Sequence, residues 1–141
     1  MRGGNLSALF LVLILAVLSM GLFACEGQEV GKAAPIGDHA VLEQLATAYR
    51  SVANEYPMQP ASMRPIHKKE FIERVFASAG YHYRATLIAF AKQGADVTNQ
   101  DQRDLAELLF LPHRGLDENG MKDLYTAEEL AAIRSIQADL K

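Results

Sequence analysis

The sequence predicts an all-α protein, a small bundle of four or five amphipathic helices. From residue 38 onward, apolar side chains recur at three- and four-residue spacing, and each stripe is narrow enough to cover one face of a shared core. In the same stretch, β-branched residues never form the alternating run that a half-buried strand needs. Helices with one apolar face bury that face against one another, and the result is a helical bundle.

The first helix is expected to begin at Asp38, a good N-cap residue, and to run to about Glu55. It ends there because Pro57 pushes the residue before it out of helical geometry. Residues 57–65 contain three prolines and are therefore expected to form a loop.

The second helix is expected to begin near Pro65 or Ile66, because proline suits the first turn of a helix. Its apolar stripe reaches Gly80, which lacks the side chain that would stabilise a helix interior. The helical pattern resumes over residues 81–92. One long helix kinked at Gly80 and two abutting helices both fit this pattern.

Two further helices are predicted near the carboxyl end. Residues 98–101, Thr-Asn-Gln-Asp, read as an N-cap at Thr98 with a carboxylate three residues on, and this helix stops before Pro112. A polar loop at residues 113–120 and a short turn at 121–125 are expected next. The last helix begins at residues 126–129, Thr-Ala-Glu-Glu, which form a capping box.

The first 24 residues differ from the rest of the chain. Arg2 is their only charged side chain, residues 8–18 are all apolar, and smaller residues are frequent at 19–24. These are the three parts of an export signal. From Leu6 to Ala24 a helix would measure roughly 28 Å at about 1.5 Å per residue, long enough to span a bilayer core. The run alone therefore fits a cleaved signal helix or an uncleaved membrane span.

The only cysteine follows this run, in the sequence Leu22-Phe23-Ala24-Cys25. The tetrapeptide resembles the lipobox of bacterial lipoprotein precursors, which typically has Leu, then a small or branched residue, then Ala or Gly, then Cys. The resemblance covers residues 1–25. It implies cleavage between Ala24 and Cys25 and a diacylglycerol on the Cys25 thiol. Ordinary secretory cleavage at this point fits poorly, because Leu22 stands where a small residue is needed.

The domain organisation and the location follow from this resemblance. We expect a lipoprotein signal peptide at residues 1–24, an acylated Cys25 with a flexible tether to residue 37, and a helical domain at residues 38–141. Residues 26–37 contain three glycines and one proline, which suit a tether. In enterobacterial lipoproteins an Asp after the Cys favours retention in the inner membrane. Glu26 at this position implies the outer membrane, with the domain facing the periplasm.

The charge of the chain argues against a dedicated nucleic-acid binder. Because Arg2 is the only charged residue before Cys25, cleavage leaves 13 basic and all 17 acidic residues, a net charge of −4. A nucleic-acid interface needs a strongly basic face.

No motif in the chain predicts catalysis, a metal or another cofactor. His39 with Glu43 and His67 with Glu70 have helical spacing, but each pair offers two ligands where zinc needs three or four. Residues 117–128 begin and end on carboxylates, as a calcium loop does. They carry Met and Lys where such a loop needs a ligand and a glycine. We therefore expect a protein that is not an enzyme.

Positive charge and aromatic side chains gather in one segment, residues 64–92, which holds six basic and two acidic residues. Arg and Tyr are frequent anchors of protein interfaces. The segment therefore supplies the candidate partner-binding residues, which are Arg64, Lys68, Lys69, Arg74, Tyr81, His82 and Arg84. The competing interpretation is that these side chains face the acidic helices or solvent, with Tyr83 in the core.

The sequence as a whole predicts a lipid-anchored, periplasm-facing lipoprotein that binds another envelope protein as an accessory or assembly factor. Three alternatives remain open. The chain could be an immunity or exclusion lipoprotein, a small periplasmic ligand-binding protein or enzyme, or an uncleaved single-span membrane protein.

Overall fold

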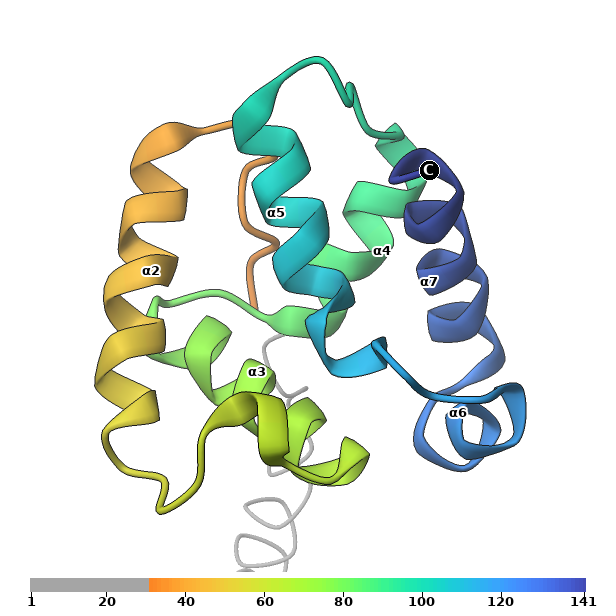
Figure 1. Cartoon of the computed structure of the whole chain (residues 1–141). Helices are drawn as coiled ribbons and strands as arrows, with labels where there is room; N and C mark the ends of the chain where they lie inside the picture. The colour runs from red at the N-terminus through yellow and green to blue at the C-terminus, as the bar shows by residue number, and fades with distance from the viewer. Residues whose placement is uncertain (1–30) are drawn as a thin grey trace, which may run out of the picture. The chain divides into compact units, whose positions relative to one another are not determined.

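The computed structural model describes residues 31–141, which form one compact unit (Figure 1). The predicted signal peptide, Cys25 and residues 26–30 lie outside the described residues. Within residues 31–141 the structure contains helices and no strand, which confirms the all-α prediction. The α-helices are α2 (His39–Ala53), α3 (Pro65–Ser78), α4 (Tyr83–Gln93), α5 (Gln100–Phe110), α6 (Glu118–Leu124) and α7 (Ala127–Asp139); the 3-10 turns are η1 (Pro60–Ser62) and η2 (Leu111–His113).

The described part has six α-helices, where the sequence predicted four or five. The additional helix is α6, which occupies residues expected to be a loop and a turn. At Gly80 the structure has two helices, one of the two alternatives left open. Gly80 has a φ of 81°, a left-handed conformation that favours glycine, and it ends α3. The following Tyr81 N–H donates to the Phe76 carbonyl (2.9 Å), a bond typical of glycine helix ends.

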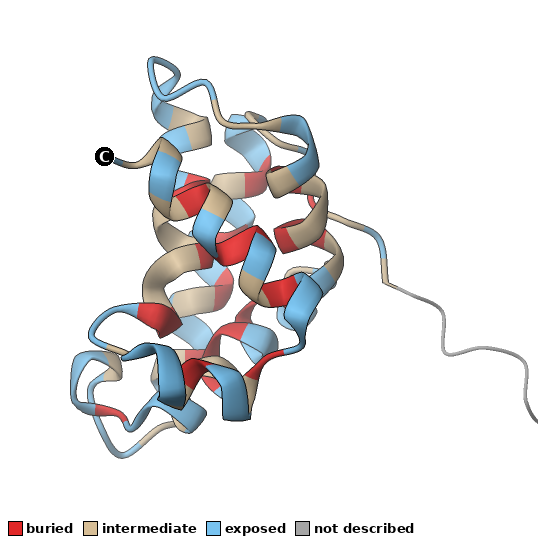
Figure 2. Ribbon diagram, turned by 90° about the vertical axis from the view of Figure 1, so that its right-hand side faces the viewer, coloured by how far each residue is buried: buried red, intermediate tan, exposed pale blue. Residues whose placement is uncertain are grey.

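The helices pack in two main pairs, α2 on α3 and α4 on α7, with α5 contacting α2, α4 and α7 (Figure 1). Figure 2 shows the buried residues on the inward faces of the helices and the exposed residues on the outward faces. Burying one such aliphatic or aromatic side chain contributes about 1.5–3 kcal/mol. The centre of the core is formed by Leu45, Phe71, Phe76, Leu87, Phe90, Leu105, Leu109, Ile133 and Ile136.

The helix caps are mostly those predicted. The Asp38 carboxylate accepts from the Ala40 N–H (2.9 Å). Thr126 and Glu129 form both bonds of the capping box at the start of α7. The N-cap of α5 is Asn99, whose side chain accepts from the Gln102 N–H (3.1 Å), and not Thr98 as predicted. Thr98 instead donates its hydroxyl and its N–H to the Asp96 carboxylate.

The first described residues, 31–37, lie on the domain, although the sequence predicted a flexible tether as far as residue 37. We call them the strap. Ala34 is only 2% exposed, and its N–H donates to the Thr86 hydroxyl (2.9 Å). The Lys32 carbonyl accepts from the His82 N–H (3.1 Å). A Cβ on Gly31 would lie 2.8 Å from the His82 Cβ, so glycine allows the chain to approach this closely.

Candidate partner-binding surfaces and a buried polar cluster

Lys69, a predicted partner-binding residue, is largely buried against α6 and Tyr125. Its side chain is 17% exposed, and its ammonium donates to the Leu124 carbonyl at the end of α6 (2.7 Å). The same ammonium lies 3.7 Å from the Glu73 carboxylate and 4.6 Å from the centre of the Tyr125 ring. Lys69 therefore joins α3 to the carboxyl end of α6, where a cation is favoured.

The two candidate arginines on α3 and α4 are ion-paired within the domain. Arg74 pairs with Glu55, beyond the end of α2, and also donates to the Tyr56 hydroxyl (3.3 Å). Arg84 reaches from α4 to the start of α7, where it lies 3.0 Å from Glu128 and 3.8 Å from Glu129. Each arginine therefore links its own helix to a neighbouring element of the domain.

Tyr81 and His82 lie in the segment between α3 and α4 and bond to different elements. The Tyr81 hydroxyl donates to the Gln44 side chain on α2 (3.2 Å). His82 is the N-cap of α4, and its Nδ1 accepts from the Ala85 N–H (3.3 Å). Tyr83, the next residue, is buried in the core as the competing interpretation expected. Of residues 81–84, Tyr83 is therefore in the core, Tyr81 is half-buried, and His82 and Arg84 are exposed.

Arg64 and Lys68 are the two candidates that remain at the surface near the start of α3. Arg64 lies 3.0 Å from His67 Nε2, and His67 Nδ1 lies 3.1 Å from the Glu70 carboxylate. Among the residues that the structure describes, the Lys68 ammonium has neither an ion-pair partner nor a hydrogen-bond acceptor. The part of the basic segment that is open to a partner is accordingly small.

A buried polar cluster, which the sequence did not predict, surrounds His113. This residue was expected in a polar loop, but it is 1% exposed and ends the turn η2. Its Nε2 lies 3.0 Å from the Tyr83 hydroxyl, which donates to the Leu109 carbonyl (3.0 Å). The His113 ring centre lies 4.6 Å from that of Tyr125. The sequence feature that could have predicted the burial of His113 is the apolar run that precedes it and extends through the buried Pro112.

The surroundings of His113 keep its imidazole neutral at pH 7. Burial, assisted by the positive charge of Lys69, lowers the pKa of His113 to about 4. Burial likewise raises the pKa of Tyr125, with the Glu73 and Glu129 carboxylates adding to the effect, and raises that of Tyr83 well above its usual value. A neutral imidazole held between two neutral phenols and closed to solvent serves the packing of α3, α4 and η2.

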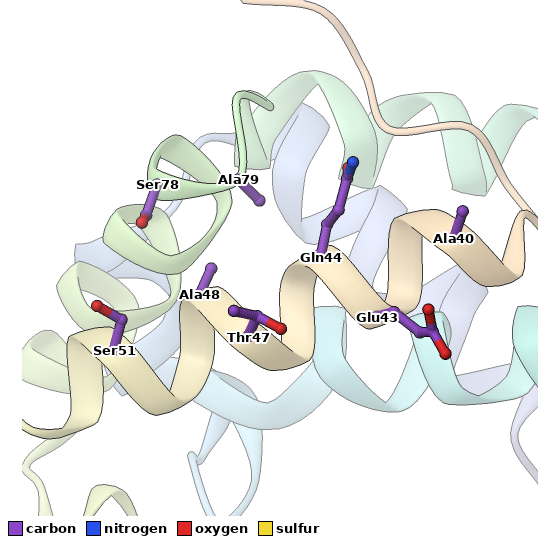
Figure 3. Close-up of a pocket in the computed structure, with 8 residues that line it drawn as sticks. All are labelled: Ala40, Glu43, Gln44, Thr47, Ala48, Ser51, Ser78 and Ala79. Atoms are coloured by element: carbon purple, nitrogen blue, oxygen red, sulfur yellow. The ribbon is translucent and has the colours of Figure 1, made fainter.

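Three open grooves of residues 31–141 lie beside α2 or α7. The largest of these three, about 720 Å³, lies between α2 and the end of α3 (Figure 3). It is lined by Ala40, Glu43, Gln44, Thr47, Ala48, Ser51, Ser78 and Ala79. A groove of about 420 Å³ lies between α2 and α5 and has a mainly apolar lining. A third, of about 340 Å³, lies between α6 and α7.

Comparisons of this chain with protein-family models, with curated proteins and with solved structures gave no match. Over residues 31–141, no helix has the length and apolar character needed to cross a bilayer. Nor does that part of the chain bring together three or more His, Cys, Asp or Glu side chains in an arrangement that could hold a metal ion.

Proposed function

We propose that this protein is a lipid-anchored lipoprotein of the bacterial cell envelope that binds another envelope protein without catalysing a reaction. The observation that carries the proposal is the sequence Leu22-Phe23-Ala24-Cys25 at the end of an apolar leader. Each methylene of an acyl chain that is buried in the bilayer contributes about 0.8 kcal/mol to membrane binding. Two or three acyl chains on Cys25 therefore anchor the protein stably, whereas a single chain is marginal. Glu26 after the cysteine favours the outer membrane, with the domain in the periplasm.

The strap supports a membrane-proximal role for the domain. Residues 31–37 pack on the domain through Ala34 and Lys32, so only residues 26–30 separate Cys25 from the folded unit. At 3.3–3.6 Å per residue, the fully extended chain from Cys25 to Gly31 spans at most about 20 Å. Such a short link suits a partner whose binding site lies close to the membrane surface.

The groove between α2 and α3 supports the protein-binding part of the proposal. The α2–α3 groove is lined by small side chains, which allow the backbone of a partner to come close. Figure 3 shows the side chains of Thr47, Ser51 and Ser78 along the same groove. Their hydroxyl groups can bond to a partner backbone at little cost in side-chain entropy.

The lipid anchor is tested by growing cells with a labelled fatty acid and isolating the protein from the membrane fraction. We expect label on the wild-type chain and none on Cys25→Ala. The matched control is the double variant Cys25→Ala/Gln28→Cys, which keeps one cysteine but moves it three residues further along the chain, away from Ala24. This control should also stay unlabelled, and labelling of it would show that acylation does not depend on the tetrapeptide.

The partner is tested by placing a photoactivatable cross-linker at Thr47, in the α2–α3 groove, in intact cells. We expect one discrete cross-linked envelope protein, and the matched control is the same group at Lys122, a lysine outside that groove. A resident envelope protein supports an accessory or assembly role, whereas an incoming protein supports an immunity or exclusion role. Equal cross-linking from both positions would contradict the groove as a binding site.

A further inference from the structure

We propose that the groove between α2 and α5 is the interface through which two copies of this chain form a symmetric dimer. In this dimer Arg50 of each copy pairs with Asp104 of the other. The inference rests on the lining of the groove and on the charges at its edges, and it is independent of acylation at Cys25.

The groove has an apolar lining that the domain leaves partly uncovered. Leu42 and Tyr49 come from α2 and Leu108 from α5, and all three are half-buried. Leu45, which is fully buried, also contributes to the lining. Figure 1 shows α2 and α5 side by side, and His39 bonds to Asp101 near their amino ends (3.0 Å). Covering partly exposed Leu and Tyr side chains is favourable by roughly 25 cal/mol per Å² of apolar surface.

Two opposite charges line this groove and have no ion pair within residues 31–141. Arg50 on α2 donates only to the Ala46 carbonyl of its own helix (3.2 Å), and Asp104 on α5 accepts from Gln100 of its own helix (2.6 Å). Four other arginines of the domain have carboxylate partners, namely Arg74, Arg84, Arg114 and Arg134, whereas Arg64 contacts His67 and Arg103 forms no ion pair within residues 31–141. The groove therefore offers one cation and one anion to whatever covers it.

A second copy of the chain satisfies both charges at once. In a two-fold dimer, if one residue contacts another across the interface, the reciprocal contact follows from the symmetry. The two-fold axis of this dimer crosses the groove midway between Arg50 and Asp104, at right angles to the line that joins them. Arg50 of each copy then lies opposite Asp104 of the other copy. The same operation brings Leu42, Tyr49 and Leu108 of both copies together between the two ion pairs. A different partner would need its own complementary pair of charges, whereas a second copy has it by construction.

The test is the oligomeric state of the full chain, purified in mild detergent and measured by sedimentation and light scattering over a range of concentrations. We expect a dimer for the wild type. Arg50→Glu and Asp104→Arg each place like charges opposite one another at both symmetric contacts of the dimer. Each variant should therefore raise the dissociation constant of the dimer at least about tenfold. The double variant Arg50→Glu/Asp104→Arg restores opposite charges and should bring the dissociation constant back to within about threefold of the wild type.

The matched control is Arg103→Glu, because Arg103 precedes Asp104 on α5 but does not line the groove. This variant should dimerise like the wild type, and circular dichroism should show that every variant is folded. A monomeric wild type, dimers that survive both single substitutions, or a double variant that stays dissociated would each overturn the proposal. Binding of another protein to this groove in place of a second copy would overturn it as well.

Discussion

Two regions of the domain treat their charged side chains differently. The α3–α4 region holds six of the 14 basic residues of the chain, and Lys69, Arg74 and Arg84 each bond to a neighbouring element. The α2–α5 groove has a single arginine and a single aspartate, and neither forms an ion pair in the described residues. A charged side chain is available to a partner when it has no ion pair within the domain. The density of charge along the sequence does not show which side chains these are.

The two regions should consequently respond to substitution in different ways. Substitution of Lys69 in the α3–α4 region should alter the stability of the domain, because it leaves partly buried groups without partners. Changes in the α2–α5 groove should alter association and leave stability nearly unchanged.

The largest effect is expected from His113 as the pH falls. The unfolded chain binds a proton at this residue near pH 6.5 and the folded chain only near pH 4, so stability is lost as the pH falls through this window. The full loss is about 3 kcal/mol, at about 1.4 kcal/mol per pKa unit. Urea unfolding of the full chain at pH 7, 5.5 and 4.5 measures it. His113→Phe keeps a ring between Tyr83 and Tyr125, and should remove this part of the pH dependence.

His39 provides the contrast for this experiment because it is exposed and bonded to Asp101, which raises its pKa. A raised pKa changes the stability in the opposite direction. The stabilising contribution of His39 is present below pH 6.5 and is lost as the pH rises through the pKa of His39 in the folded chain. His39→Ala should therefore leave the acid-side loss in place. Equal pH profiles for the wild type and His113→Phe would contradict the assignment to His113.

The second largest effect is expected for Lys69→Ala. This change removes the bond to the Leu124 carbonyl, the pairing with Glu73 and the contact with the Tyr125 ring, so we expect a loss of about 2 kcal/mol in the free energy of unfolding. The neighbouring Lys68→Ala is the matched control and should cost less than about 0.5 kcal/mol. Similar losses for the two lysines would remove the distinction between a structural and a free cation.

A loss of about 1 kcal/mol is expected for Thr86→Val, which removes the acceptor of the buried Ala34 N–H. Hydrogen exchange at the Ala34 amide should become faster, because the strap is held by fewer bonds. Thr47→Val, on the open surface of α2, serves as the control and should leave that exchange rate unchanged. An unchanged exchange rate at Ala34 in the Thr86 variant would show that the strap is held in another way.

The smallest effect on stability is expected for Arg50→Ala in the α2–α5 groove. Its only intramolecular bond is to a carbonyl of its own helix, so the unfolding free energy should change by less than about 0.5 kcal/mol. Dimer dissociation should increase in the same variant. This comparison is best made at a concentration where the wild type is monomeric, because dimerisation itself raises apparent stability.

The features that the sequence predicts correctly are those that depend on neighbours along the chain. Asp38 as a cap, Pro65 in a first turn and the capping box at Thr126 each involve residues within one helical turn. The disturbance of the helix at Gly80 is also local, because it depends on one glycine conformation, but the sequence left a kink and a break equally open.

The features that the sequence did not predict depend on distant contacts. His113 is buried because Tyr83, 30 residues earlier, meets its ring. The Leu124 carbonyl, 55 residues after Lys69, accepts a hydrogen bond from the Lys69 ammonium. The strap packs through a bond between Ala34 and Thr86, which are 52 residues apart. Spacing along the chain contains none of these contacts, so local charge could not show that Lys69, Arg74 and Arg84 have partners within the domain.

The central claim, that a lipid on Cys25 anchors this domain, is tested most directly by the intact mass of the protein from the membrane fraction. The account predicts a chain shorter by 24 residues that carries added acyl mass, and neither change in Cys25→Ala. An unmodified full-length mass for the wild type would contradict it, and would leave a membrane-span protein in which Cys25 has no special role.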